Sequence, residues 1–268
     1  MYPRLFTIGS FSVPTYGVLV AIGFLVGLFL VSRSAKRAGL NPDHVGNLAI
    51  YVFLAAIVGA KGFMILANAD YYFSHPGRIF SLSALQAGGV FYGGLLAALG
   101  TAFWFTRKYD LPWLGTADIF APGLAIGHGV GRLGCFAAGC CWGKESSLPW
   151  AISFTDPIAN QFVGVPLNVD LHPTQLYESF GTLVVGFFLL WLCRRPHISG
   201  TIIGWYLILY STFRLGVEFL RDTSGRVFPG DIFLSTTQWI ALGLILSGII
   251  VLVCRKNSQH IHKPERSR

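Results

Sequence analysis

The stretch PTYGVLVAIGFLVGLFLVS, residues 14–32, decides the fold class, because it contains no charged side chain in 19 consecutive positions. A helix needs roughly 20 apolar residues to cross the hydrocarbon core of a bilayer. Further apolar segments, each bounded by charge, proline or glycine clusters, lie at residues 45–67, 90–106, 116–139, 176–193, 201–220 and 238–254. The pattern predicts an all-α, polytopic membrane protein with about seven transmembrane helices.

The composition supports the same class. Of 268 residues, 53% are hydrophobic and only 12% are charged, whereas soluble domains carry about 25% charged residues. Abundant aliphatic and aromatic side chains exclude a disordered chain, and five cysteines are too few for a disulfide scaffold. Because the apolar segments take up most of the chain, we expect residues 1–268 to form a single integral membrane domain.

The distribution of lysine and arginine predicts the orientation. One set of alternate loops holds twelve of these residues and the other set holds five, and cytoplasmic loops retain positive charge. This places the N-terminus outside and the C-terminus inside, with a basic cytoplasmic tail at residues 255–268. The net charge of +8 is then explained by topology and by anionic lipid headgroups, so no nucleic-acid partner is expected.

Polar residues converge at the predicted outer ends of the spans. A charge at the bilayer centre costs roughly 2.5–3.5 kcal/mol, so it normally faces a cavity, a partner or a ligand. Spacings of four, four and three put Tyr210, Arg214, Glu218 and Arg221 on one helical face. We therefore expect one polar cavity, open to the outer leaflet, that also collects Tyr16, Tyr92, Arg132 and the segment from His172 to Glu178.

The arginines of this cavity indicate an anion. Arg214 and Glu218 have the spacing of an i,i+4 ion pair, which could be their whole role. Arg132 and Arg221 then remain, and three guanidiniums with one obvious acidic partner suggest a missing anion. The planar fork of arginine suits a phosphate, and a phospholipid headgroup is the nearest one. Arg221 could instead be interfacial and reach towards water.

Two histidines are candidates for a role in this cavity. His128 lies four residues before Arg132, on the same face of a regular helix, and could act as a base. It could equally be hydrogen-bonded between helices. His172, beside Pro173 at a predicted helix start, could cap the helix or orient the loop, or it could have an ordinary structural role.

The region from residue 123 to residue 143 holds seven glycines and three cysteines. The GxxxG at Gly127 and Gly131 indicates close helix packing, although glycines also let backbone N–H groups approach a lipid phosphate. The GxGxxG match there is not a dinucleotide site, because no strand precedes it. Cys135, Cys140 and Cys141 lack the paired C-x2-C spacing of structural zinc, so packed thiols or a disulfide are favoured over a metal.

Several of these motifs together resemble the prolipoprotein diacylglyceryl transferases of the bacterial inner membrane, over nearly the whole chain. The matching pieces are Tyr16, Phe91-Tyr92-Gly93-Gly94-Leu95, Ala117-Asp118-Ile119-Phe120-Ala121-Pro122, Gly131-Arg132-Leu133-Gly134 with Trp142-Gly143, His172-Pro173-Thr174-Gln175-Leu176-Tyr177-Glu178, and the run from Tyr210 to Arg221.

The resemblance implies a seven-helix transferase. Such an enzyme moves a diacylglyceryl group from phosphatidylglycerol to the lipobox cysteine of a preprolipoprotein and releases glycerol 1-phosphate at the outer surface of the inner membrane. It implies that Arg132 and Arg214 are the essential catalytic arginines. It places a set of substrate-binding residues around them: Tyr16, Gly134, His172, Tyr210, Glu218 and Arg221.

The chain also departs from this family. Tyr92 stands where the family usually has histidine, and Cys135, Ala138 and Cys140 stand where it usually has Asn, Asn and Glu. His128 or Tyr92 would then have to accept the thiol proton. No metal or organic cofactor is expected. The alternatives are a divergent paralogue with another lipid donor or acceptor, and a non-enzymatic lipid- or anion-binding membrane protein.

Overall fold

The computed structural model of the chain describes residues 2–8, 11–79, 89–222 and 234–254. Within these residues the structure is mainly helical, with only short strands and no closed sheet. The long helices are α1 (Thr15–Arg37), α2 (Pro42–Ala67), α5 (Phe91–Lys108), α6 (Trp113–Ala138), α8 (Thr174–Leu192), α9 (Thr201–Glu218) and α10 (Thr236–Cys254). The short elements are β1 (Arg4–Ile8), β2 (Phe11–Pro14), α3 (Ala69–Ser74), the 3₁₀ helix η1 (Pro76–Arg78), β3 (Ile152–Ser153), α7 (Pro157–Val163) and β4 (Asp170–Leu171).

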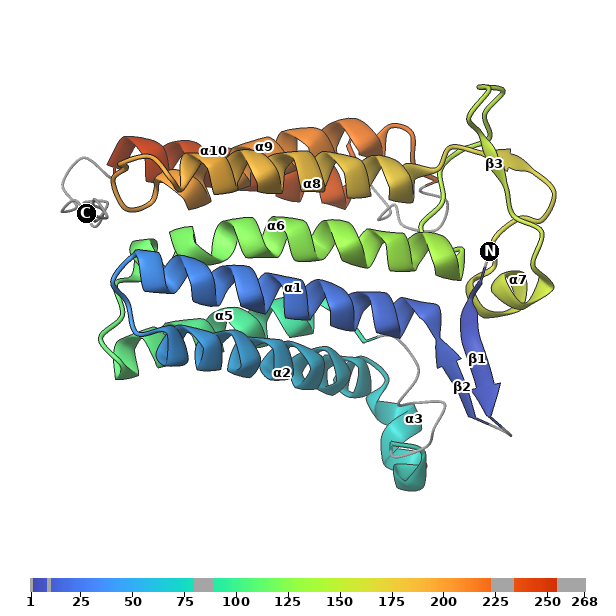
Figure 1. Cartoon of the computed structure of the whole chain (residues 1–268). Coiled ribbons are helices and arrows are strands. Elements are labelled where there is room, and N and C mark those ends of the chain that lie inside the picture. The colour runs from blue at the N-terminus through green and yellow to red at the C-terminus, as the bar shows by residue number, and fades with distance from the viewer. Residues whose placement is uncertain (1, 9–10, 80–88, 223–233, 255–268) are drawn as a thin grey trace. The chain divides into compact units, whose positions relative to one another are not determined.

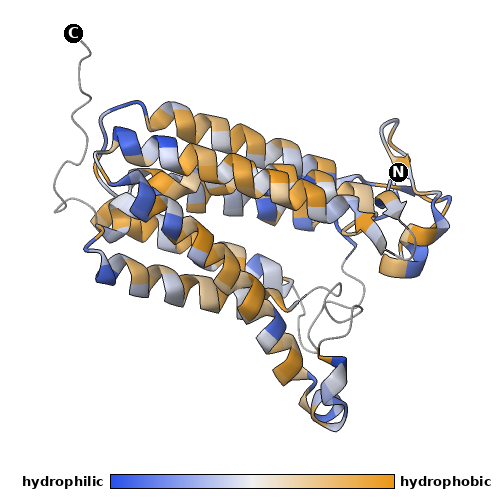
Figure 2. Cartoon of the chain, turned by 60° about the horizontal axis from the view of Figure 1, so that its bottom comes forward, coloured by the Kyte–Doolittle hydropathy of each residue, from blue (hydrophilic) through white to orange (hydrophobic). Residues whose placement is uncertain are grey.

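Each of the predicted apolar segments falls on one long helix, so the prediction of an all-α membrane protein is confirmed. Within the described residues, α1, α2, α8 and α10 are long and apolar enough by length and composition to cross a membrane. Figure 2 shows apolar residues along most of the length of the long helices. Seven crossings and an external N-terminus remain predictions.

The contacts divide the chain into two compact units, Met1–Ala38 with Ala117–Arg268, and Gly39–Thr116. The expectation of a single integral membrane domain remains a prediction. The basic tail at residues 255–268 lies outside the described residues.

In the unit Gly39–Thr116, α2 packs directly against α5. A Cβ atom on Gly59 would lie 2.6 Å from the carbonyl oxygen of Gly93, and a Cβ on Gly93 would lie 2.6 Å from that of Gly59. These distances are too short for any side chain, so the two backbones approach closely only because both residues are glycine. Asn41 caps α2 by accepting a hydrogen bond from the backbone N–H of Asp43 at 2.9 Å.

In the larger unit, α1 and α6 pack through facing glycines. A Cβ on Gly127 would lie 2.8 Å from the carbonyl oxygen of Gly23, and a Cβ on Gly123 would lie 2.9 Å from that of Gly27. A Cβ on Gly131 would meet nothing within 4 Å. The predicted close packing is therefore real, but its glycines are Gly123 and Gly127, one helical turn earlier than the pair that the GxxxG match indicated.

The helices α8, α9 and α10 complete this unit, with α8 against α9 and α9 against α10, and Figure 1 shows them running side by side with α6 and α1. At one end, Asp118 on α6 caps α9. Its carboxylate accepts hydrogen bonds from the backbone N–H groups of Gly200 at 2.7 Å and Ile203 at 2.8 Å. These N–H groups have no partner within their own helix, so the carboxylate joins α6 to α9.

At the other end, residues 139–173 form a small irregular subdomain with its own core. Buried Phe154, Ala159, Val165 and Leu171 form this core, and Phe136 and Trp142 pack against it. β3 pairs with β4 in an antiparallel two-stranded sheet, and Figure 1 shows β3 and α7 beyond the ends of α6 and α8. The subdomain connects α6 to α8 at the end where the predicted polar residues lie.

Candidate functional site

Glu178, in the second turn of α8, is the centre of a buried ion-pair cluster. Its carboxylate lies 2.5 Å from Arg132 Nη2, 3.6 Å from Arg214 Nε and 3.7 Å from Arg221 Nη1. Only 2% of Glu178 is exposed to solvent. Three arginines, one on α6, one on α9 and one just after α9, thus meet on one carboxylate.

Arg214 also pairs with Glu218, one turn further along α9. The distance from Arg214 Nη1 to Glu218 Oε2 is 2.5 Å, which confirms the predicted i,i+4 ion pair. Ser235 Oγ donates a hydrogen bond to Glu218 Oε1 at 3.1 Å. The five side chains Arg132, Glu178, Arg214, Glu218 and Arg221 together carry one net positive charge.

The premise that the arginines have one acidic partner is therefore wrong. The segment from His172 to Glu178 was predicted to face the same cavity, but spacing along α8 did not show that the Glu178 carboxylate pairs with the arginines. Because Glu178 contacts all three arginines, a missing anion is not needed to explain their burial. Spacing within one helix does not reveal an acidic side chain that approaches from another helix.

Arg221 does not lie on the helical face predicted for it. The helix α9 ends at Glu218, and residues 219 and 220 form a turn. Arg221 instead forms an isolated antiparallel bridge with Gly143, and the Lys144 N–H donates to the Leu220 carbonyl at 2.9 Å. The subdomain of residues 139–173 therefore holds Arg221 against Glu178, at a position that helical spacing did not predict.

His128 and Arg132 lie on the same face of α6, as predicted. Arg132 Nε donates a hydrogen bond to His128 Nε2 at 3.2 Å, and the His128 ring centre lies 5.4 Å from that of Tyr210. Tyr210 in turn stacks on Tyr206 at 5.6 Å. His128 Nε2 would need a free lone pair to accept a proton. That lone pair already accepts the hydrogen bond from Arg132.

His172 lies between β4 and α8, where its backbone holds the loop before α8 in place. Its N–H donates to the Lys144 carbonyl at 2.9 Å, and its carbonyl accepts from the Gly143 N–H at 3.0 Å. Its Nδ1 lies 3.4 Å from the hydroxyl oxygen of Tyr177, which also accepts a hydrogen bond from Trp150 Nε1 at 2.8 Å. These contacts orient the loop that leads into α8.

Tyr16 and Gly134 meet where α1 begins and α6 approaches its end. A Cβ atom on Gly134 would lie 3.2 Å from both Tyr16 Cδ2 and the Tyr16 carbonyl oxygen, so a larger residue at Gly134 would displace the tyrosine. Tyr16 is 45% exposed. Tyr92 belongs to the other compact unit, in the first turn of α5, and is 47% exposed. Its part in the site stays a prediction.

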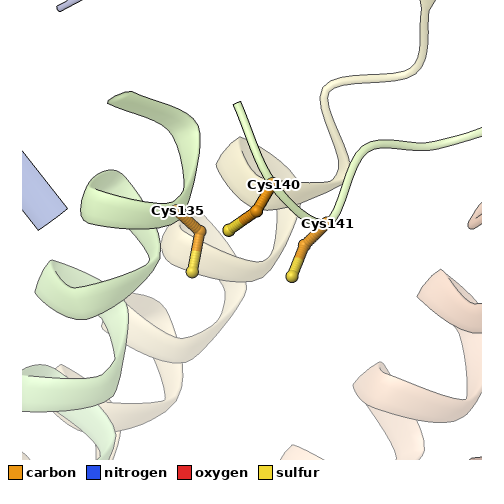
Figure 3. A group of neighbouring side chains, drawn as sticks. All are labelled: Cys135, Cys140 and Cys141. Atoms are coloured by element: carbon orange, nitrogen blue, oxygen red, sulfur yellow. The ribbon is translucent and has the colours of Figure 1, made fainter. Parts of the chain in front are cut away.

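Cys135, Cys140 and Cys141 lie beside the arginines, with their sulfur atoms all within 4.8 Å of one another (Figure 3). Arg132 Nη1 lies 4.0 Å from Cys135 Sγ. Hydrogen bonds from Cys135, and then from Cys140, to the sulfur of Cys141 lower the pKa of Cys141. Hydrogen bonds with Cys135 and Cys141 raise the pKa of Cys140, so Cys141 ionises before Cys140.

Three arginines and two glutamates meet at one end of the helices of this membrane protein. Such a cluster can form a binding site for an anionic, lipid-like ligand. Comparison with known proteins assigns the class. Residues 3–254 match the model of the family described as prolipoprotein diacylglyceryl transferase, and the chain belongs to this family of transferases.

Relatives named phosphatidylglycerol–prolipoprotein diacylglyceryl transferase occur in several bacteria. The relative from Clostridium tetani is 36% identical over 253 residues, which are 94% of this chain and 96% of the relative. One from Vibrio cholerae is 35% identical over 256 residues, covering 94% of this chain and 90% of the relative. One from Vibrio campbellii is 34% identical over 256 residues, covering 94% and 89%.

Proposed function

We propose that this protein transfers a diacylglyceryl group from phosphatidylglycerol to the lipobox cysteine thiol of a preprolipoprotein, the first step of bacterial lipoprotein maturation. The observation that carries the proposal is the buried cluster of Arg132, Arg214 and Arg221 around Glu178 in a chain of this family. Phosphatidylglycerol supplies the phosphate that such guanidiniums bind.

The proposed reaction is a displacement at carbon. The acceptor thiolate, which is the nucleophilic form of a thiol, attacks the glyceryl carbon bonded to the phosphate oxygen. A carbon–sulfur bond forms, the carbon–oxygen bond breaks, and its electron pair leaves with glycerol 1-phosphate. Arg132 and Arg214 stabilise the charge that develops on this phosphate. Donors already held in place are effective because they need little reorganisation when the charge appears.

The carboxylates of the cluster have a positioning role in this proposal. Glu178 holds Arg132 at 2.5 Å and Glu218 holds Arg214 at 2.5 Å, so both guanidiniums are oriented before a lipid arrives. The net positive charge of the five side chains favours an anionic headgroup over a neutral one. Tyr16, Gly134, His172 and Tyr210 lie at the same end of this unit and are proposed to shape the substrate site.

The proposed setting is the bacterial cytoplasmic membrane, with the site towards the outer leaflet. The excess of lysine and arginine in the alternate loops supports this orientation. The lipobox cysteine of an exported preprolipoprotein reaches the membrane on this side, next to phosphatidylglycerol.

Complementation tests the proposal. A bacterial strain conditionally depleted of its diacylglyceryl transferase would express this protein, and a reporter lipoprotein would be analysed by mass spectrometry. We expect growth and a diacylglyceryl thioether on the reporter cysteine, with both lost in Arg132→Ala and Arg214→Ala. Arg195→Ala is the matched control, because this exposed arginine lies over the Trp191 ring, away from Glu178.

Two outcomes would overturn the proposal. If the wild-type protein is present in the membrane but the reporter stays unmodified, the chain is a paralogue with another donor or acceptor. If Arg132→Ala and Arg214→Ala modify the reporter as well as Arg195→Ala does, the cluster is not the site.

A further inference from the structure

The three cysteines at the end of α6, Cys135, Cys140 and Cys141, have no role in the transfer proposed above. Cys135 lies in the last turn of α6, and Cys140 and Cys141 follow the end of this helix. Figure 3 shows the three side chains side by side, one from the helix and two from the chain that leaves it. All three are free thiols of intermediate exposure.

The backbone that brings these sulfurs together is specifically held. Gly139 has a φ of +77° and Cys141 a φ of +65°. The second value is uncommon for a residue with a side chain and is kept only where the surroundings impose it. Here buried side chains of α8 impose it: Gln175 Nε2 donates to the Cys140 carbonyl at 2.7 Å and Thr174 Oγ1 to the Cys141 carbonyl at 2.8 Å.

The sulfur spacing suits a single soft metal ion. Tetrahedral zinc with Zn–S bonds of about 2.3 Å requires sulfurs roughly 3.8 Å apart, and the three sulfurs already lie within 4.8 Å of one another. Small side-chain rotations therefore suffice to close the group. In the described part of the chain, this group holds three ligand residues. Three protein ligands and one open position are the arrangement of catalytic zinc.

The charges around the group also favour zinc. Three thiolates and one Zn²⁺ carry one net negative charge, and the five side chains of the neighbouring ion-pair cluster carry one positive charge. Arg132 links the two, since its guanidinium contacts both Glu178 and the Cys135 sulfur. A Cu⁺ ion on the same thiolates would leave two negative charges before any acceptor thiolate binds.

We propose that Cys135, Cys140 and Cys141 bind one zinc ion whose open fourth position takes the acceptor cysteine of the preprolipoprotein. The role in transfer rests on the function proposed above, whereas the metal site itself does not.

The zinc ion would activate the acceptor cysteine, which is the nucleophile. A thiol that coordinates zinc loses its proton, which passes to water, and the zinc-bound sulfur then forms the new bond to the glyceryl carbon. The electron pair of the broken carbon–oxygen bond leaves with the phosphate. The thioether product has no thiolate charge and is released, and water returns to the zinc. No side-chain base is needed, which agrees with the engagement of His128 Nε2 by Arg132.

Metal analysis of the full-length protein in detergent tests the site. Purification in the presence of Zn²⁺, followed by removal of loosely bound metal, should leave about one zinc per chain. The triple variant Cys135→Ser/Cys140→Ser/Cys141→Ser should retain less than a tenth of this. Cys193→Ser/Cys254→Ser is the matched control and should retain all of it. Size-exclusion chromatography of each variant separates loss of metal from loss of fold.

Cobalt reports on the fourth position without any turnover. Replacement of zinc by Co²⁺ should produce thiolate-to-metal charge-transfer absorption, which grows when a lipobox peptide with its cysteine is added. The same peptide with serine should leave the spectrum unchanged.

The outcomes separate this inference from the proposed function. Active enzyme without zinc, or with a disulfide or copper in the cysteine group, overturns the zinc site and leaves the transferase in place. One zinc per chain and a cobalt response to the cysteine peptide, without any transfer to the reporter, retains the site and overturns the function. Transfer that a chelator abolishes and zinc restores supports both.

Discussion

Two carboxylates buried in the same compact unit, Asp118 and Glu178, are satisfied in opposite ways. Asp118 accepts hydrogen bonds from the backbone N–H groups of Gly200 and Ile203 at the start of α9. Glu178 contacts three guanidiniums instead. Backbone dipoles are fixed by the helix and serve the fold. Side-chain charges can exchange partners with a ligand, so we propose that the anionic substrate binds at the Glu178 end.

The largest expected effect comes from Glu178→Gln, which keeps the shape but removes the charge. Three buried arginines then lose a common partner, and breaking a buried ion pair typically costs about 3–5 kcal/mol. We expect thermal unfolding of the detergent-solubilised protein at a much lower temperature, together with loss of transfer. An unfolding temperature close to that of the wild type would show that Glu178 is not the centre of the cluster.

Arg132→Ala tests whether the same end of the molecule performs the chemistry. Removal of one donor to a developing oxyanion typically lowers turnover about 10²–10³-fold, and we expect a loss of this size in a purified assay with phosphatidylglycerol micelles and a lipobox peptide. Arg195→Ala should retain full turnover. A loss confined to binding of the lipid, with unchanged turnover at saturation, would reassign Arg132 to substrate binding alone.

Gly127→Ala tests the helix that carries both Asp118 and Arg132. The added Cβ would lie 2.8 Å from the Gly23 carbonyl oxygen, and overpacking of this kind costs about 1–3 kcal/mol. Gly131→Ala is the matched control, because its Cβ meets nothing within 4 Å, and alanine in a helix interior is about 0.5–1 kcal/mol better than glycine. Equal unfolding temperatures in the two variants would argue against close α1–α6 packing.

Asp118→Asn should lower stability less than the substitutions above and should not lower turnover. One amide oxygen replaces two carboxylate oxygens at the start of α9, and loss of a capping interaction costs about 1 kcal/mol. We expect a modest fall in unfolding temperature with turnover kept at the wild-type level once the protein is folded. A loss of turnover at full stability would place Asp118 in the chemistry and remove the contrast with Glu178.

The smallest expected effect is a difference in reactivity between two thiols, Cys193 and Cys141, at opposite ends of this unit. Burial, and then the charge of Asp118, raise the pKa of Cys193 to about 12, whereas hydrogen bonds from its neighbours lower the pKa of Cys141. Alkylation requires thiolate, so in zinc-free protein Cys141 should still react as the pH falls below about 8.5, where Cys193 does not. Peptide mass spectrometry after iodoacetamide treatment at pH 7 measures this. Preferential labelling of Cys193 would reverse the assignment.

Much of the site could be predicted where it depends on spacing within one helix. The Arg214–Glu218 pair and the His128–Arg132 contact both join residues four apart, and a helix brings such residues together whatever packs around it. Gly131 and Arg221 show the limit of this reasoning. Helical spacing placed Gly131 in the packed pair and Arg221 on the face of α9, but the partner helix and the end of α9 decided otherwise.

By itself, the sequence determined the long apolar helices, the membrane class and the family resemblance, because the length and hydrophobicity of a segment and its local motifs do not depend on distant residues. Only the tertiary structure decided that Glu178 joins three arginines and that Cys135, Cys140 and Cys141 bring their sulfurs together. These contacts link α6, α8, α9 and the chain after α6. Their distances depend on how helices pack and where they end, which hydrophobic periodicity along one segment does not record.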